Sequence, residues 1–227
     1  MTIKHKMQRA AAGLAFDRII RYIEKDPQKN LEKLINKSQK YVKNIFPQEN
    51  FEKFRLAVKD PNHVWTRFAL GMIQDIDRTV LKKMLLALGL GAAYEGTKAV
   101  RTNREKYRCN IPWVILLDPT SACNKSCRGC WSAEYGHQQS LSYDELDSIV
   151  NQGVELGTHF YMFTGGEPLL RKEDILRLCE NHPDCAFLSY TNATLVDEAF
   201  CRAMKKVGNL SLAISIEGMK DTNDLRR

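Results

Sequence analysis

Apolar residues recur at helical spacing along the first hundred residues, with polar residues between them. This periodicity is typical of amphipathic helices. A proline, or the glycine pair Gly89 and Gly91, follows most of these segments, as expected where helices end. We therefore predict an all-helical region over residues 1–110, with helices over 7–25, 28–46, 51–59, 62–88 and 97–107.

The pattern changes after residue 110, where short apolar runs alternate with amphipathic segments. A short, continuous apolar run is typical of a strand that is buried on both faces. We predict four such strands, at 112–117, 160–163, 186–190 and 210–216. The segments between them predict helices over 142–156, 172–181 and 197–207. Because strands that alternate with helices form βα units, we predict the α/β class and a parallel sheet for residues 111–227.

The chain stops at Arg226-Arg227, shortly after the fourth predicted strand. A parallel sheet needs both of its faces and its edges covered. We therefore expect residues 111–227 to form an incomplete core domain, and the chain to be the N-terminal portion of a longer polypeptide.

Charge divides the chain at the same place as the hydrophobic pattern. Residues 1–110 carry 23 Lys and Arg against 11 Asp and Glu, a net charge of +12, whereas residues 111–227 carry 11 against 16, a net charge of −5. The basic charges are dispersed along the helices, with no strip of interleaved aromatic residues, so we predict no specific nucleic-acid binding. A solvated face explains them most simply, and contact with an anionic membrane surface stays open.

No apolar stretch approaches the roughly 18 residues that span a bilayer, and no export signal opens the chain. We therefore predict a cytoplasmic protein. Three of the seven cysteines gather at Cys123, Cys127 and Cys130. In a chain without an export signal, such a group indicates metal binding or catalysis rather than a disulfide framework.

Polar motifs follow the first three predicted strands and lie at the end of the fourth. They are the three cysteines, Gly165-Gly-Glu-Pro168, Thr191-Asn192, and Ser215 with Glu217. The carboxyl ends of parallel strands form one edge, which is the functional face of α/β folds. We therefore expect these motifs to meet at one site.

Two metal centres are compatible with the cysteines by themselves. Three thiolates hold three irons of a four-iron cluster and leave the fourth iron open for a ligand. The alternative is a structural zinc site, which needs four ligands and would take His137 as the fourth. Zinc leaves the motifs at the other strand ends unexplained, so we favour the iron–sulfur cluster.

These motifs, in this order and spacing, resemble those of the radical S-adenosylmethionine (radical SAM) superfamily. The neighbourhood of the cysteines is similar to members with a twitch-type or SPASM-type extension. The resemblance covers residues 111–227 and implies a partial (β/α)6 barrel, of which about four βα units are present. In this family an aromatic residue often precedes the third cysteine, whereas here Gly129 stands there and Trp131 follows.

The resemblance also implies cofactors and roles. Cys123, Cys127 and Cys130 would bind a [4Fe-4S] cluster whose open iron chelates S-adenosylmethionine, and reduction would produce a 5′-deoxyadenosyl radical. The residues expected to bind the S-adenosylmethionine are Gly165, Gly166, Glu167, Asn192, Ser215 and Glu217.

The radical would take a hydrogen atom from a substrate that the sequence does not identify. The substrate class is a peptide or protein, or a small metabolite or lipid. An electron donor such as flavodoxin or ferredoxin is expected as a partner. A non-catalytic metal-binding fragment is the remaining alternative.

Overall fold

The computed structural model describes residues 3–42, 48–136 and 138–227, and these divide into two compact units. The first unit extends to Leu86 and the second comprises Ala87–Arg227. The division leaves the last residues of the predicted helical region in the second unit. The predicted boundary between residues 110 and 111 marks the change from helices to strands, and as a domain boundary it stays a prediction.

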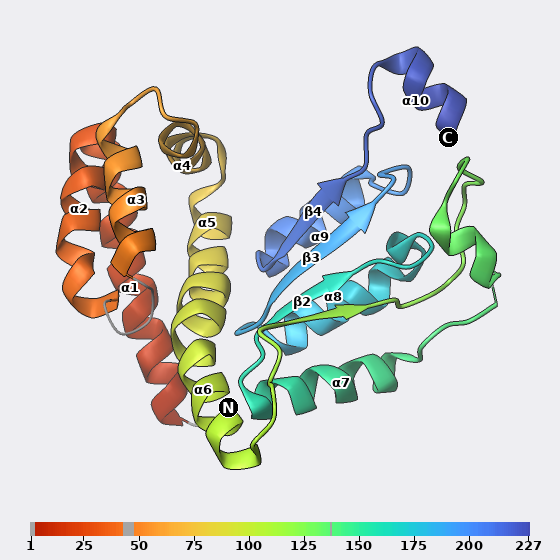
Figure 1. Cartoon of the computed structure of the whole chain (residues 1–227), viewed down its shortest axis with the longest axis horizontal. Helices are drawn as coiled ribbons and strands as arrows, with labels where there is room; N and C mark the ends of the chain where they lie inside the picture. The colour runs from red at the N-terminus through yellow and green to blue at the C-terminus, as the bar shows by residue number, and fades with distance from the viewer. Residues whose placement is uncertain (1–2, 43–47, 137) are drawn as a thin grey trace. The chain divides into compact units, whose positions relative to one another are not determined.

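Helices alone make up the described part of the first unit (Figure 1). Their apolar sides form one cluster around Ile23, Phe51 and Val58. The helices are α1 (Ile3–Lys25), α2 (Pro27–Val42), α3 (Gln48–Lys59), α4 (Val64–Asp75) and α5 (Arg78–Met84). The predicted end of the second helix, at residues 43–46, lies outside the described residues.

The single helix predicted over 62–88 is wrong, because the chain breaks between α4 and α5. Asp77 lies at the break, and its side chain accepts hydrogen bonds from the backbone N–H groups of Thr79 and Val80. An aspartate in this position caps a new helix. Its side chain thus starts α5 within a segment whose apolar periodicity is continuous.

The glycine pair does not end a helix either. The chain continues from α5 through a π-helical segment, η1 (Leu85–Gly96), into α6 (Thr97–Tyr107). Ala87 and Ala92 are fully buried on this segment. A glycine inside a helix reduces stability by only about 1 kcal/mol relative to alanine, and the burial of neighbouring apolar side chains offsets this loss.

The second unit contains a four-stranded sheet in which every neighbouring pair is parallel and the order is β1-β2-β3-β4. The strands are β1 (Val114–Leu117), β2 (Phe160–Phe163), β3 (Ala186–Thr191) and β4 (Leu210–Ile214). The helices that follow them are α7 (Tyr143–Leu156), α8 (Lys172–Asn181), α9 (Glu198–Val207) and the short α10 (Lys220–Arg226). This arrangement confirms the predicted α/β class and the four βα units of a partial barrel.

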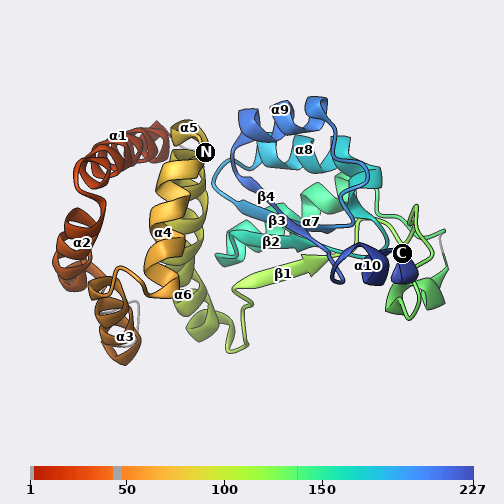
Figure 2. The same cartoon turned by 90° about the horizontal axis from the view of Figure 1, so that it is seen from above.

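Helices α7, α8 and α9 cover one face of the sheet (Figure 2). Side chains from that face and from the helices form a single core, in which Tyr161, Phe163 and Phe187 are among the largest fully buried residues. On the opposite face Leu116 is 58% exposed and Tyr190 is 41% exposed. Within the described residues, no helix has the length and apolarity needed to cross a membrane.

Candidate functional site

The predicted motifs meet at the carboxyl ends of the four strands. They line one cavity of about 190 Å³, and the residues that contribute to it include all nine predicted ligands, namely Cys123, Cys127, Cys130, Gly165, Gly166, Glu167, Asn192, Ser215 and Glu217. The expected convergence of four strand ends is therefore present. The individual roles of these residues stay predictions.

The three cysteines lie on the loop between β1 and α7, where all three are free and half-buried. Burial raises the pKa of the Cys123 thiol. The hydrogen bond from the backbone N–H of Lys125 lowers this pKa, and the nearby charge of Glu167 raises it further. A hydrogen bond of 3.3 Å from the backbone N–H of Cys130 to the carbonyl of Cys127 closes the turn between these two residues.

The residues before the cysteines are tied down by Thr120, which is buried. Its hydroxyl accepts hydrogen bonds from the backbone of Ala122 and from the Ser140 hydroxyl, and donates to the carbonyl of Gln139. The segment that leaves the cysteine loop therefore returns along the segment that enters it.

The two glycines of the second motif allow the cysteine loop to lie directly on β2's carboxyl end. The N–H of Gly166 donates to the carbonyl of Thr120 at 3.0 Å, and that of Glu167 donates to Ala122 at 2.8 Å. A Cβ atom on Gly166 would lie 2.0 Å from the carbonyl oxygen of Ala122. Gly165 has a φ of 107°, and a Cβ atom on it would lie 2.6 Å from the carbonyl oxygen of Thr120. These glycines therefore hold the backbone that carries the cysteines, in addition to any contact with a cofactor.

Glu167 is 1% exposed, and protein groups occupy both of its carboxylate oxygens. It accepts hydrogen bonds from the backbone N–H of Leu169 at 3.0 Å, the hydroxyl of Thr191 at 2.7 Å and the backbone N–H of Asn192 at 2.8 Å. The carboxylate therefore joins the end of β2 to the end of β3. Its predicted contact with S-adenosylmethionine would be made in addition to these bonds.

Asn124, which the sequence does not single out, supports the site from outside the residues that line the cavity. Its amide donates to the Thr194 hydroxyl at 2.8 Å and accepts from the Asn192 side chain at 2.9 Å. It thus connects the cysteine loop to the residues after β3. Its place within the cysteine motif was the only signal in the sequence, and that signal does not reveal a partner seventy residues away.

Arg226 and Arg227 also line the cavity, a position that no motif in the sequence indicates. Glu217 pairs with both, at 3.4 Å from Arg226 Nε and 3.3 Å from Arg227 Nη2. The backbone N–H of Arg128 donates to the carbonyl of Arg226, so α10 contacts the cysteine loop. Two cations therefore lie at the rim of the cavity.

The three cysteines supply the ligands that a four-iron cluster takes from a protein, since each cysteine binds a different iron. All three line one cavity. Among the described residues, which exclude His137, no group of three or more His, Cys, Asp or Glu side chains is arranged around a single ion.

The comparison with protein families decides between these interpretations. Residues 117–227 match the model of the Radical SAM superfamily. These residues belong to the radical SAM superfamily. The match confirms the superfamily and the enzyme class that the sequence predicts, and the two cofactors are those of the superfamily, a [4Fe-4S] cluster and S-adenosylmethionine.

Proteins similar to this chain include one from Archaeoglobus fulgidus named only as uncharacterized, which is 32% identical over 137 residues, or 59% of this chain and 33% of that protein. The Fe-coproporphyrin III synthase of Methanosarcina barkeri is 28% identical over 49% of this chain and 29% of its own length. A GTP 3′,8-cyclase of Alkaliphilus metalliredigens is 32% identical over 47% of this chain and 35% of its own length. The chain thus spans about a third of each relative.

Two solved structures are also similar. Streptococcus suis SuiB bound to S-adenosylmethionine matches 73% of this chain and 39% of its own, with 15% identity and a TM-score of 0.49. The anSMEcpe protein with bound AdoMet and a peptide matches 50% of this chain and 34% of its own, with 24% identity and a TM-score of 0.43.

Proposed function

We propose that this chain is part of an enzyme that cleaves S-adenosylmethionine reductively and starts radical chemistry on its substrate. The supporting observation is the single cavity where Cys123, Cys127 and Cys130 meet the motifs of the three other strand ends. When bound, the [4Fe-4S] cluster and S-adenosylmethionine supply a 5′-deoxyadenosyl radical, which abstracts a hydrogen atom. We therefore also propose the oxidoreductase class.

The chain's own residues bind and orient. The three cysteines hold the cluster as thiolates. Gly165 and Gly166 keep the cysteine loop against β2 and present their backbone to the methionine part of the cofactor. Glu167, Asn192, Ser215 and Glu217 border the same cavity, with Ser215 and Glu217 assigned to the ribose or carboxylate groups.

Arg226 and Arg227, which pair with Glu217, suit the carboxylate group of the cofactor in this assignment. Their pairing holds the Glu217 carboxylate in place at the rim, and each guanidinium has more donors than that pairing uses. Guanidinium groups bind carboxylates well. The carboxylate of the methionine part is the anionic group of the cofactor that they would receive.

We propose a small molecule as the substrate. Two relatives are named for small-molecule chemistry, as a porphyrin synthase and a nucleotide cyclase. Up to residue 107 the described residues form no strand, and a winged-helix region for peptide leaders would need strands. Peptide modification is the second class. We further propose a cytoplasmic protein that receives its electron from a flavodoxin-type or ferredoxin-type donor, because a low-potential cluster and free cysteines need reducing conditions.

The test is anaerobic reconstitution of the chain with iron and sulfide, followed by reduction with S-adenosylmethionine and assay of 5′-deoxyadenosine. We expect a four-iron cluster and release of the nucleoside, both lost in Cys127→Ala. Cys201→Ala is the matched control, since Cys201 is an exposed cysteine on α9 away from the cavity. Wild-type protein that binds zinc but no iron, or a Cys127→Ala variant that behaves like wild type, would contradict the proposal.

A further inference from the structure

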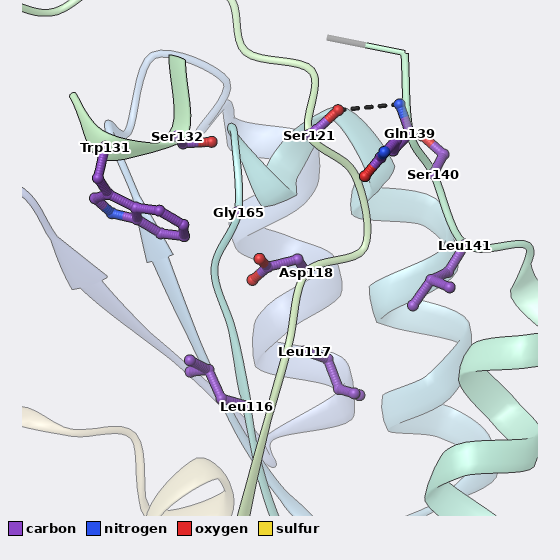
Figure 3. Close-up of a pocket in the computed structure, with 10 residues that line it drawn as sticks. All are labelled: Leu116, Leu117, Asp118, Ser121, Trp131, Ser132, Gln139, Ser140, Leu141 and Gly165. Atoms are coloured by element: carbon purple, nitrogen blue, oxygen red, sulfur yellow. Dashed lines mark hydrogen bonds between the residues drawn. The ribbon is translucent and has the colours of Figure 1, made fainter. Parts of the chain in front are cut away.

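A second cavity, of about 590 Å³, lies between the end of β1 and the segment that follows the third cysteine (Figure 3). We call it the Asp118 cavity. Leu116 and Asp118 line it from β1 and its carboxyl end, and Trp131 and Gln139 line it from the returning segment. It is large enough for a small organic molecule.

The Asp118 cavity adjoins the candidate cofactor site. Gly165 and Trp131 line both. A Cβ atom on Gly165 would lie 3.1 Å from that of Asp118, so Asp118 lies against the glycine motif. A molecule in the Asp118 cavity therefore lies next to whatever fills the cofactor site, where a substrate must be.

Asp118 is the one charged residue among the described residues that line this cavity. In the view of Figure 3 its carboxylate points toward the segment that carries Gly165, and Trp131 lies on the other side of that segment. Burial raises the pKa of Asp118, and within the described part of the chain no hydrogen bond or ion pair offsets that burial. By contrast, the neighbouring Ser121 hydroxyl already accepts a hydrogen bond from the backbone of Gln139 at 3.0 Å.

The Asp118 side chain is exposed to solvent and lines the cavity, so its carboxylate is accessible to a cationic group of a ligand, with which it can form a charge-assisted hydrogen bond. The other walls suit the rest of such a ligand. Leu116 is apolar, and the exposed ring of Trp131 projects toward the same space from the opposite side (Figure 3). The face of an indole ring attracts cations as well as apolar groups.

We propose that the Asp118 cavity binds the substrate, and that this substrate carries a cationic nitrogen group, an amine or an amidine, which pairs with Asp118. Its apolar part lies along Leu116 and Trp131. Calling the ligand a substrate rests on the proposed function. The preference of the cavity for a cation rests only on the residues that line it.

Three probes of one shape test this preference: benzamidine is a cation, benzamide is neutral and benzoate is an anion. Binding to the full chain is followed by the NMR signal of the Trp131 indole N–H, assigned with Trp131→Phe. We expect benzamidine to bind about tenfold or more tightly than benzamide, because a charge-assisted pair is stronger than a neutral contact. Benzoate should bind most weakly.

Asp118→Asn should remove the advantage of benzamidine and leave benzamide binding unchanged, which also shows that the variant is folded. Asp144→Asn, an exposed aspartate at the start of α7, makes the same charge change and should retain the wild-type order. If Asp118→Asn does not fold, Asp118→Ala replaces it.

The proposal is overturned if the three probes bind equally, if none shifts the Trp131 signal, or if Asp118→Asn retains the preference. It is also overturned if Asp118→Asn weakens S-adenosylmethionine tenfold but leaves benzamidine unaffected, because the carboxylate would then belong to the cofactor site. Probe binding requires neither cluster nor turnover, so chain that binds benzamidine but releases no 5′-deoxyadenosine refutes the proposed function and leaves the cation preference intact.

Discussion

At the scale of the residue, Glu167 illustrates how a predicted ligand can also hold the site together. Its carboxylate receives three donors while almost fully buried. In Glu167→Gln an amide N–H₂ group would replace one acceptor oxygen and face a backbone N–H. We expect the free energy of unfolding to fall by about 2 kcal/mol in urea denaturation, because a buried donor is left unsatisfied. Glu155→Gln, on an exposed side chain of α7, should change it by less than about 0.5 kcal/mol. Equal effects of the two changes would contradict this role.

Gly166 makes a second prediction at the same scale. In Gly166→Ala the new methyl group would overlap the Ala122 carbonyl, so the cysteine loop must shift. We expect a loss of about 2 kcal/mol of stability or more, and less iron bound after reconstitution. Gly89→Ala is the control, because nothing lies within 4 Å of its Cβ position and alanine favours a helix. Iron binding by Gly166→Ala at the wild-type level would show that the close backbone approach is not required.

At the scale of the element, α9 is fixed at its start by Asp197. This carboxylate accepts hydrogen bonds from Lys172 of α8 at 2.8 Å and from the backbone N–H of Phe200 at 2.7 Å. The hydrogen bond from Lys172 lowers the pKa of Asp197 below its ordinary value, and the hydrogen bond from the backbone N–H of Phe200 lowers it further. A carboxyl with a lowered pKa stabilises the fold above the unfolded-state pKa of about 4, and that contribution is lost as the pH falls through the lowered value.

The difference in stability between wild type and Asp197→Ala should therefore be largest near neutral pH and shrink below about pH 4. Urea denaturation at a series of pH values measures it. Asp224→Ala, an exposed aspartate of α10, should show no such dependence. A difference that stays constant down to about pH 2.5 would mean that the charge of Asp197 contributes nothing.

At the scale of the whole molecule, the chain has two separate apolar clusters, one in each compact unit. We expect two thermal transitions in calorimetry, because a chain with two cores need not unfold as one. Ile23→Ala should lower the midpoint temperature of one transition, and Leu178→Ala that of the other. Each should reduce the free energy of unfolding of its own unit by the roughly 2–5 kcal/mol typical of a large-to-small change in a core. If each substitution lowers both transitions equally, the two clusters unfold as one unit.

Features that depend on near neighbours in the chain could be predicted from local sequence patterns. Unbroken apolar runs located the four strands, but the predicted burial of both faces is wrong for the described residues, because Leu116 and Tyr190 on the face opposite the helices are exposed. Alternation with helices then implied parallel pairing, and the carboxyl ends of the strands brought Cys123, Gly165 and Ser215 to one edge. Local pattern was insufficient where one side chain overrides it, as at Asp77, whose capping bonds divide a helix that the apolar spacing predicts as continuous.

Hydrogen bonds and close contacts between residues far apart in the chain could be found only in the folded structure. Glu167 bonds to β3, and Asn124 bonds to Thr194, so each joins two separate segments. Asp118 and Trp131 line one cavity from two different segments. No period or motif in the sequence encodes such distances, because they are set when the sheet forms and the loops pack on its edge. Burial and the satisfaction of polar groups are properties of the assembled site, so they cannot be assigned to a segment before the chain folds.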